Sequence, residues 1–486
     1  MKTSKLDKYQ RKAVRSNSKN LLVIAGAGSG KTFTIVEKIK EIIKDGLSSE
    51  EILCISFTNA AAKNLEDKLK KQNIHIKVNT FHSLGYRIIS EYKTVKPAKD
   101  DRLEKIIEKN ISKEKYLREI LNLKFIRLGS PDKIYNKLEN NIIKNSEYKS
   151  KLKKIMIMFI NIYKSGNHKI KDFETFEKIN KNTNLYNQKK RHKKFLILIK
   201  RTIKSYNTEL IKHHEIDFHD MINMATNIVK RKSSLSYKYI IIDEYQDTSL
   251  NKTELIKEIQ KKSNAKLMVV GDDWQSIYAF TGSNLEVFTN FKKIFPNSKI
   301  IKLKNTYRNS KELVKVTEKF ICKNPNQLKK KIKSNKKNPS PIKIYYYQNS
   351  PNEILEKILK KINSNSTLIL GRNNKDINII PKKYRNRFMT IHKSKGLETE
   401  NTVIINLEDK YDSLPSKIKE SEYLKYVKPK IDNYQYAEER RLFYVALTRT
   451  KNQNYLLVNK NNPSTFVTEL IKNRKKYIEI IDLIKK

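Results

Sequence analysis

A glycine-rich run ends in residues that could bind a phosphate chain. Residues 25–32 read Ala25-Gly26-Ala27-Gly28-Ser29-Gly30-Lys31-Thr32, after an apolar segment and before a helical pattern. Glycines let backbone N–H groups point inward around phosphates, and the N-terminus of the following helix attracts negative charge. Lys31 would then hold the terminal phosphates, and the Thr32 hydroxyl would bind Mg²⁺. Ala25 replaces the first glycine of the general pattern, and a glycine-rich turn without a ligand is the alternative that the Gly-Lys-Thr ending disfavours.

Two acids follow a second apolar run. Asp243 and Glu244 come directly after Ile240-Ile241-Ile242. In a parallel sheet, ligands bind beyond the carboxyl ends of the strands. Asp243 is therefore expected to bind Mg²⁺, and Glu244 to orient and deprotonate an attacking water. A surface acid pair is the alternative, and it fits less well because both acids continue a strand that is expected to be buried.

The segments around these motifs alternate between strands and helices, which predicts parallel α/β units. In the first part of the chain, strands are expected at 21–25, 52–57, 239–242 and 267–270, with helices from about 31 and over 60–70. In a second block, strands are expected at 300–303, 342–347, 367–370 and 403–407. The simplest architecture is α/β, with two P-loop-like lobes.

Between residues 96 and 205 the composition changes. Glycine almost vanishes, and apolar residues recur at three- and four-residue spacing, which predicts a helical insertion in the first lobe. Its basic run at 189–194 could contact nucleic acid or form a solvated helix face. A second Lys- and Asn-rich stretch, 329–341, is predicted to be an exposed loop.

The charge balance is strongly basic. The 486 residues include 103 Lys and Arg against 51 Asp and Glu, for a formal net charge of +52. Such a charge favours a polyanionic partner, and nucleic acid fits best because phosphate contacts release counterions. A general bias towards Lys and Asn, with solvated lysines on every face, explains the excess equally well.

The cysteine content and the lack of long apolar runs indicate the cellular compartment. Two cysteines, Cys54 and Cys322, are too few for a disulfide framework or a zinc cluster, and we expect buried thiols in a reducing compartment. No apolar run approaches the length of a membrane span, and the N-terminus does not resemble a signal peptide. The sequence predicts a soluble, intracellular protein without a membrane partner.

Further segments match one family in order. Residues 243–248, Asp-Glu-Tyr-Gln-Asp-Thr, resemble the DExQD box of UvrD/Rep-like helicases of superfamily 1A. The other matching segments are Gln10 within 6–10, 55–62 (motif Ia), 80–83 (TFHS), 270–278 (motif III), 305–308 (motif IV), 368–374 (motif IVa), 389–398 (motif V) and 438–449 (motif VI). A single match would be weak, whereas the ordered set is specific.

The resemblance implies roles around ATP and Mg²⁺. Gln10 would read adenine, and Tyr307 would stack on it, with Phe33 in the position where the family usually has Arg. Glu398 would meet the ribose, and Gln275 would sense the γ-phosphate. The last two residues, Arg308 and Arg449, belong to the second lobe and would stabilise transition-state charge when the lobes close.

The resemblance also implies a track for nucleic acid, because single strands bind by stacking on aromatic rings in a basic groove. The residues that it assigns to the track are Phe57, Thr58, Asn59, His82, Tyr278, Phe280 and His392. Phe280 stands for the usual Trp of motif III, and Thr281 for the usual Arg. His82 could instead be a buried structural histidine.

In the family, the two lobes are RecA-like. The resemblance divides this chain into lobe 1A (1–95 and 206–298), a helical insertion 1B (96–205) and lobe 2A (299–486). Only about sixteen residues separate motif IVa from motif V, so the 2B domain that the family carries there is expected to be absent. The implied function is an ATP-dependent 3′-to-5′ DNA helicase or single-strand translocase that binds single strands and single-strand/duplex junctions, with accessory loading proteins unidentified. An RNA-directed motor and a non-hydrolysing nucleic-acid-binding protein remain alternatives.

Overall fold

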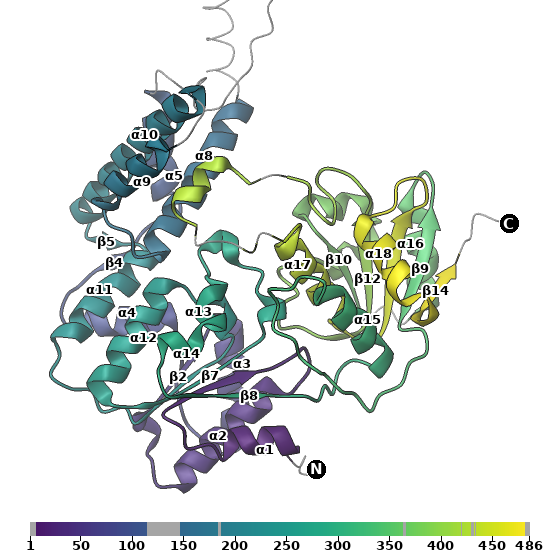
Figure 1. Cartoon of the computed structure of the whole chain (residues 1–486), viewed down its shortest axis with the longest axis horizontal. Coiled ribbons are helices and arrows are strands. Elements are labelled where there is room, and N and C mark those ends of the chain that lie inside the picture. Colours follow the sequence, from purple (N-terminus) through teal and green to yellow (C-terminus); the bar gives the residue numbers. More distant parts are fainter. Residues whose placement is uncertain are drawn as a thin grey trace, which may run out of the picture.

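The computed structural model describes residues 6–113, 146–182, 186–362, 366–418, 420–428, 432 and 434–481. Two α/β lobes lie side by side, and a group of helices rises from the first lobe (Figure 1). The two RecA-like lobes expected from the sequence are confirmed, because each contains a sheet of six parallel strands flanked by helices.

The first lobe is built on a sheet with the order β3-β2-β6-β7-β1-β8. Its strands are β1 (Asn20–Ile24), β2 (Ile52–Ser56), β3 (Val78–Thr80), β6 (Tyr239–Ile242), β7 (Lys266–Gly271) and β8 (Ser298–Lys302). Alternate side chains of β1 enter two cores, Leu22 one and Val23 the other. Burial on both faces explains why the predicted strands are continuous apolar runs instead of alternating ones.

Helices cover both faces of this sheet (Figure 1). They are α1 (Lys8–Val14), α2 (Lys31–Lys44), α3 (Asn59–Lys70), α4 (Phe81–Ser90), α11 (Phe218–Arg231), α12 (Leu250–Ser263), α13 (Leu285–Thr289) and α14 (Phe291–Ile294). The helices expected from about 31 and over 60–70 are therefore present as α2 and α3.

One strand was predicted in the wrong lobe. β8 pairs in parallel with β1, with Asn20 opposite Ser298 and Ile24 opposite Lys302. It therefore closes the first sheet, and the boundary predicted between 298 and 299 divides a strand of lobe 1. The sequence could not show this, because β8 pairs with β1, which lies far away in the sequence, near the N-terminus.

The second lobe has the sheet order β11-β10-β12-β13-β9-β14. Its strands are β9 (Ile342–Tyr347), β10 (Thr367–Gly371), β11 (Phe388–Thr390), β12 (Thr399–Leu407), β13 (Thr450–Asn459) and β14 (Ile478–Ile481). Its helices are α15 (Lys311–Ile321), α16 (Pro351–Lys361), α17 (Ala437–Leu447) and α18 (Thr465–Arg474). Between β10 and β11, where every residue is described, lie only the short 3-10 helices η6 (Asn374–Ile379) and η7 (Lys382–Arg387), so no 2B-sized domain is inserted there.

The insertion is helical as predicted. Its described helices are α5 (Arg102–Ser112), α8 (Ser146–Ser165), α9 (Asp172–Lys181) and α10 (Tyr186–Lys212). The two-stranded pair β4 (Lys96–Pro97) and β5 (Glu215–Ile216) joins its two ends. The boundary predicted at 205 was wrong, since it falls inside α10, whose buried Tyr206 and Leu210 continue the apolar face of the helix.

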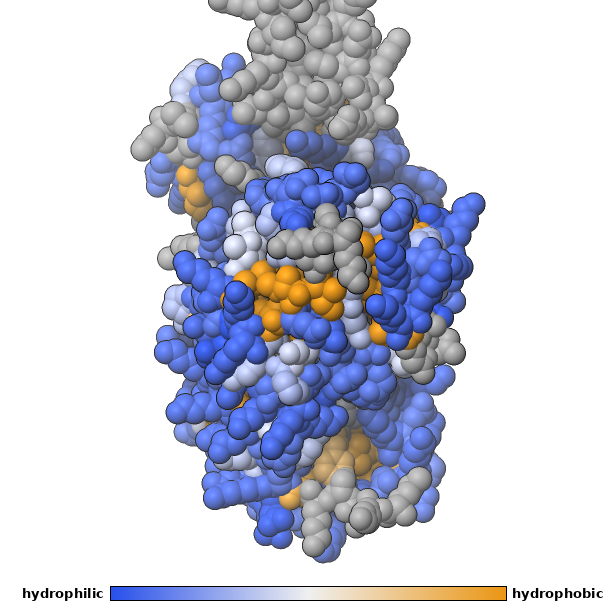
Figure 2. Space-filling view, turned by 90° about the vertical axis from the view of Figure 1, so that its right-hand side faces the viewer, coloured by the Kyte–Doolittle hydropathy of each residue, from blue (hydrophilic) through white to orange (hydrophobic). Residues whose placement is uncertain are grey.

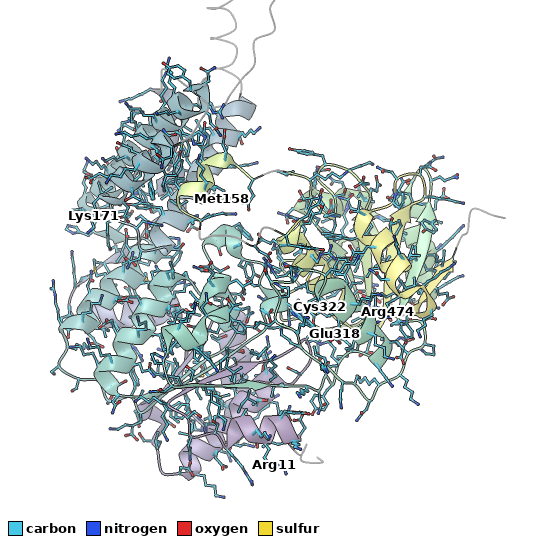
Figure 3. The ribbon with its side chains drawn as sticks, viewed as in Figure 1. Arg11, Met158, Lys171, Glu318, Cys322 and Arg474 are labelled. Carbon is cyan, nitrogen blue, oxygen red and sulfur yellow. The ribbon has the colours of Figure 1, made fainter. Side chains whose placement is uncertain are left out.

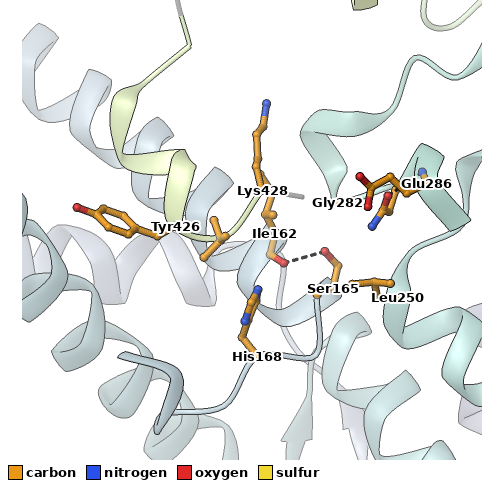
Figure 4. A pocket seen from close by; sticks show the side chains of 11 residues that line it. Ile162, Ser165, His168, Leu250, Gly282, Glu286, Tyr426 and Lys428 are labelled. Carbon is orange, nitrogen blue, oxygen red and sulfur yellow. Dashed lines mark hydrogen bonds between the residues drawn. The ribbon is translucent and has the colours of Figure 1, made fainter. Parts of the chain in front are cut away.

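A segment between β12 and α17 crosses from the second lobe to the insertion (Figure 1). We call residues 420–428, which include the 3-10 helix η8 (Glu422–Tyr426), the strap. The Tyr423 ring stacks on Phe195 of α10 with a centroid distance of 3.9 Å. Together with α8 and the start of α12, the strap lines a cavity of about 300 Å³ (Figure 4).

The strap also contacts part of the basic run at 189–194. His192 is fully buried and its Nδ1 lies 2.7 Å from the Tyr426 hydroxyl, while Arg191 pairs with Glu422. This part of the run therefore binds the second lobe, and of the six residues only Lys190 and Lys193 are exposed. Neither of the two expected uses, nucleic-acid contact or a solvated face, describes Arg191 and His192.

The surface is consistent with the composition. The lobe 2 side of the molecule is mostly hydrophilic, with a limited band of hydrophobic side chains (Figure 2). Among the described residues, no helix combines the length and the apolar character needed to cross a membrane.

Both cysteines are free, and burial raises the pKa of the Cys54 and Cys322 thiols. Cys322 lies near Glu318 at the end of α15 (Figure 3).

Candidate nucleotide and nucleic-acid site

The glycine-rich run forms a loop between β1 and the first residue of α2. Gly28 and Gly30 have positive φ angles of 68° and 78°, which side chains with a Cβ rarely adopt. The Ser29 hydroxyl is buried without a hydrogen-bond partner in the described structure. The first N–H groups of α2 lack intrahelical acceptors, as at any helix start. The loop therefore presents unused donors at one point, and Thr32 lies half-buried beside them as the second residue of α2.

Lys31 is held by the acids that follow β6. Its Nζ lies 2.5 Å from Glu244 Oε1. Burial alone would lower the pKa of Lys31, but the charges of Glu244 and Asp243 raise it. Burial and the charge of Glu244 raise the pKa of Asp243 to about 6. Burial acts to raise the pKa of Glu244 as well, yet the charges of Lys31 and Lys395 lower it to about 2. An anion at this loop would have to take Lys31 from Glu244.

Three side chains from separate segments of the chain converge on Gly30. A Cβ at Gly30 would lie 2.7 Å from Gln10 Nε2, and 3.9 Å from both Phe33 Cβ and Tyr307 Cε2. Gln10 Nε2 donates to the Ser29 carbonyl at 3.2 Å. This brings together the three residues expected around the base.

Asp7, which was not predicted as a site residue, holds this cluster together. Its Oδ1 caps α1 by accepting from the Gln10 amide at 2.8 Å. Its Oδ2 accepts from the Tyr307 hydroxyl at 2.7 Å and from Asn305 Nδ2 at 2.9 Å. The capping-box spacing of Asp7 and Gln10 was the available signal.

The segment 305–308 lies directly on the phosphate-binding loop. Thr306 Oγ1 donates to the Ala27 carbonyl at 2.8 Å, and the Tyr307 amide donates to the Gly28 carbonyl at 2.9 Å. A Cβ at Gly28 would collide with Arg308 Cβ. Gly28 is therefore required for this close approach as well as for its backbone conformation.

Arg308 points from this segment towards the second lobe. Its Nε donates to Glu398 Oε2 at 3.0 Å, and its Nη1 donates to the Thr448 carbonyl at 3.2 Å. Glu398 also pairs with Lys451 at 3.2 Å. Burial acts to raise the pKa of Glu398, but the charges of Arg308 and Lys451 lower it. In this arrangement Glu398 is thus paired with both Arg308 and Lys451.

Arg449 is fully buried between the lobes. Its Nη2 donates to Gln275 Oε1 at 2.9 Å, and its Nη1 donates to the Leu397 carbonyl at 3.2 Å. Gln275 in turn donates from Nε2 to Asp272 Oδ2 at 2.5 Å. A second-lobe guanidinium therefore reaches the first lobe through one side-chain amide.

Lys330 extends this chain of contacts and corrects a prediction. The stretch 329–341 was expected to be an exposed loop, yet Lys330 is only 3 % exposed. Its Nζ pairs with Asp272 and Asp273, lying 2.6 Å from Asp273 Oδ1, and donates to the Ala25 carbonyl at 3.2 Å. Ile332 of the same stretch contacts Gly26. Two buried acids at the end of β7 require a counter-charge, and this lysine supplies it.

The aromatic residues expected in the nucleic-acid track lie together where the two lobes meet. The Phe57 and Tyr278 rings stack with a centroid distance of 5.9 Å and an interplanar angle of 22°. Phe280, 41 % exposed, meets the His392 ring edge-on at 5.5 Å. The Tyr278 hydroxyl donates to the His392 carbonyl at 3.2 Å, so the cluster joins both lobes.

The other expected track residues are Thr58 and Asn59, which follow Phe57 in the chain, and His82. Thr58 caps α3 by accepting from the Ala61 amide at 3.1 Å, and Asn59 begins that helix in an exposed position. His82 is half-buried, and burial lowers its pKa to about 3. Its ring lies 4.8 Å from that of Phe218, which is 52 % exposed.

Phe218 was missed as a surface aromatic. Its segment, 217–220, begins α11, where the Asp217 side chain accepts from the Asp220 amide at 2.8 Å. Lys164 of α8 lies 2.5 Å from Asp217 and 2.6 Å from Asp220, so the same acids anchor the insertion. An exposed Phe beside a capping acid was the signal that could have marked it.

Lys395 joins the two parts of the site. Its Nζ lies 2.5 Å from Asp247 Oδ2 and donates to the Gln275 carbonyl at 2.6 Å. The same ammonium lies 5.0 Å from the centroid of the Tyr278 ring. A second-lobe cation therefore contacts both the acidic motif of the nucleotide side and an aromatic ring of the track.

A phosphate-binding loop after β1, a pair of acids after β6 and a buried second-lobe arginine that reaches the first lobe through Gln275 define a two-lobe P-loop NTPase. Sequence comparison gives the family: residues 6–296 match the UvrD/REP helicase N-terminal domain, and residues 382–461 match the UvrD-like helicase C-terminal domain. The chain belongs to the UvrD/Rep family of DNA helicases.

Individual relatives agree. The chain is 28 % identical to DNA helicase IV of Escherichia coli (strain K12), over 97 % of this chain and 71 % of the relative. It is 31 % identical to the ATP-dependent DNA helicase Rep of Buchnera aphidicola subsp. Acyrthosiphon pisum, over 83 % of this chain and 61 % of the relative. It is 26 % identical to the ATP-dependent DNA helicase PcrA of Bacillus subtilis (strain 168), over 71 % of this chain and 43 % of the relative. The match thus covers most of this chain but only part of each relative.

Proposed function

We propose that this protein is an ATP-driven motor that moves 3′ to 5′ along single-stranded DNA and unwinds duplex at single-strand/duplex junctions. The observation that carries the proposal is a single network of contacts between the two lobes. In it, Arg449 contacts Gln275, Gln275 contacts Lys395, and Lys395 contacts the Tyr278 ring of the aromatic track. Family membership, with relatives named ATP-dependent DNA helicases, supports ATP as fuel and DNA as substrate.

The residues at the loop fit a Mg²⁺ nucleotide. The unpartnered Ser29 hydroxyl and the helix start offer donors to phosphate oxygens. Thr32 and Asp243 would hold Mg²⁺, whose preference is for hard oxygen ligands, and the ion would neutralise charge on the phosphates. Lys31 would turn from Glu244 to the β- and γ-phosphates. Residues 25–30 would wrap the phosphate chain with their backbone.

The base and ribose would lie on the α1 side of the loop. Gln10 would read the adenine edge, which favours ATP over GTP because a wrong base leaves buried polar groups unpaired. Phe33 and Tyr307 would cover the two ring faces. Glu398 would reach the ribose once Arg308 turned towards phosphate.

Hydrolysis would use the residues released by that exchange. Glu244, freed from Lys31, would accept a proton from the attacking water. Arg308 and Arg449 would stabilise charge on the γ-phosphate in the closed state, and Gln275 would report its presence to the track.

The track would bind a single strand by stacking, with little preference for base. Phe57, Tyr278 and Phe280 offer the rings, and the net charge of +52 supports strong attraction to phosphate. In the family, 2B contacts duplex and regulates unwinding. The short stretch between β10 and β11 therefore favours translocation over a firm hold on duplex, while the insertion could substitute by charge.

Displacement of streptavidin from biotinylated oligonucleotides tests this proposal. With ATP and Mg²⁺, we expect clearance from the 5′ end of a DNA oligonucleotide and none from the 3′ end. Clearance only from the 3′ end would reverse the polarity. Clearance from RNA but not from DNA would identify an RNA-directed motor, and binding without ATP hydrolysis would identify a non-hydrolysing binding protein.

A further inference from the structure

A lysine beside the track has no anionic partner. Lys252 is the third residue of α12, and its Nζ lies 4.4 Å from the centroid of the Phe57 ring and 5.5 Å from that of Phe81. Within the described part of the chain, no carboxylate or carbonyl accepts a hydrogen bond from this ammonium. The residue is only partly buried, so an anion can reach it.

The surroundings make this charge costly. Burial lowers the pKa of Lys252 to about 8, and the charge of Asp247 only partly opposes that effect. Asp247 is already paired with Lys395 at 2.5 Å. A cation in the first turn of a helix also opposes the helix dipole, because N–H groups point towards it.

The other titratable neighbours do not offset the charge. Burial lowers the pKa of His82 to about 3 and that of His219 to about 4, so both rings are neutral at pH 7. Asp217, the remaining acid near these rings, is paired with Lys164 at 2.5 Å. Lys252 is thus an unpaired ammonium among neutral rings next to Phe57. An anion carried by a ligand bound in the track would neutralise its charge.

We propose that Lys252 binds a backbone phosphate of the single strand whose base lies at Phe57. The inference rests on the proposed function, because it requires a strand on the track. Its chemistry is that of a point charge: Lys252 would neutralise one phosphate and release one condensed counterion, whereas the neighbouring rings would contribute stacking that is nearly independent of salt.

The salt dependence of binding separates these contributions. The affinity for a fluorescent oligo(dT) would be measured by anisotropy at increasing NaCl for the wild type, Lys252→Met, Lys252→Arg and Lys261→Met, an exposed lysine near the other end of α12. We expect Lys252→Met to weaken binding severalfold and to reduce the slope of log K against log salt by about 0.7, the value for one phosphate contact on a single strand. Lys252→Arg should restore the slope, and Lys261→Met should leave it unchanged.

Thermal unfolding of the free proteins gives a second readout. Removing an uncompensated cation should leave the Tm of Lys252→Met unchanged or raised. Weaker binding with an unaltered slope, or a lowered Tm, would show that Lys252 only supports the Phe57 ring, and unchanged binding would remove the proposal altogether. Absence of oligo(dT) binding by the wild type would instead overturn the proposed function together with this inference.

Discussion

The nucleotide side of the lobe interface and the nucleic-acid track use charge in opposite ways. On the nucleotide side the cations are paired: Lys31 with Glu244, Lys330 with Asp272 and Asp273, and Lys395 with Asp247. In the track, Phe280 is exposed and the ammonium of Lys252 lacks a partner among the described residues. Binding at the first region must therefore exchange existing partners, whereas binding at the second adds new contacts.

This difference predicts which quantity each substitution changes. In the paired region, a lost side chain disturbs the exchange of partners that hydrolysis requires, so kcat should fall. In the track, a lost side chain removes a contact with the strand, so DNA affinity should fall while kcat at saturating DNA changes less.

The largest effect is expected for Glu244. Glu244→Gln should lower kcat by up to about 10⁴-fold, because the amide cannot accept the proton of the attacking water. Nucleotide affinity should be retained or improved, since Lys31 no longer has to leave an ionised partner. Steady-state hydrolysis and fluorescent-nucleotide binding measure the two effects, with the surface variant Glu254→Gln as control. Wild-type turnover in Glu244→Gln would remove its role as the base.

Next in size are the two arginines of the interface. Arg449→Ala and Arg308→Ala should each lower kcat by about 10³-fold, because a charge directed at the γ-phosphate acts mainly in the transition state. The nucleotide Kd should rise far less. Arg474→Ala, at the end of α18, is a matched arginine control outside the interface (Figure 3). A change confined to nucleotide affinity in both interface variants would contradict closure of the lobes on ATP.

Lys330 should have a smaller effect through Asp272. Lys330→Met leaves Asp272 and Asp273 without their counter-charge, which should displace Gln275 and Arg449 and lower kcat by about 10²-fold, the scale of a small misplacement in an active site. KM for ATP and oligo(dT) affinity should change little. Lys329→Met, its exposed neighbour, is the control. Partial recovery of kcat in Lys330→Arg would support a positioning role, and an equal loss in Lys329→Met would contradict it.

The smallest effect is expected in the track. Phe280→Ala should reduce oligo(dT) affinity by about 1–3 kcal/mol if the ring stacks one base, and Phe57→Ala should do the same. Phe280→Trp, which restores the usual residue of the family, should retain or strengthen binding. Anisotropy titrations measure these differences. An unchanged affinity in Phe280→Ala would exclude this exposed ring from the track.

The sequence predicted the features that local pattern controls. The loop 25–32, the acids after β6 and most strands were found because each is marked within a few residues by glycines, acids or an apolar run. The motif order then indicated which residues should meet, and the structure brings Gln10, Phe33 and Tyr307 together at Gly30.

The features that were missed depend on contacts between distant residues. β8 was assigned to the wrong lobe because its partner β1 precedes it by most of the chain. Lys330 looks like its neighbours in a Lys-rich stretch, and only the two buried acids show why this lysine turns inward. His192 is buried because the strap crosses to the insertion, and no local sequence pattern predicts that crossing.

The rate of ATP hydrolysis with and without single-stranded DNA tests most directly whether the track and the nucleotide site work as one machine. At saturating ATP and Mg²⁺, we expect oligo(dT) to raise kcat by at least about tenfold, which corresponds to about 1.4 kcal/mol of the barrier. Lys395→Met should reduce this ratio, because Lys395 contacts both Asp247 and the Tyr278 ring. A kcat that is the same with and without DNA in the wild type would contradict the coupling of the two regions.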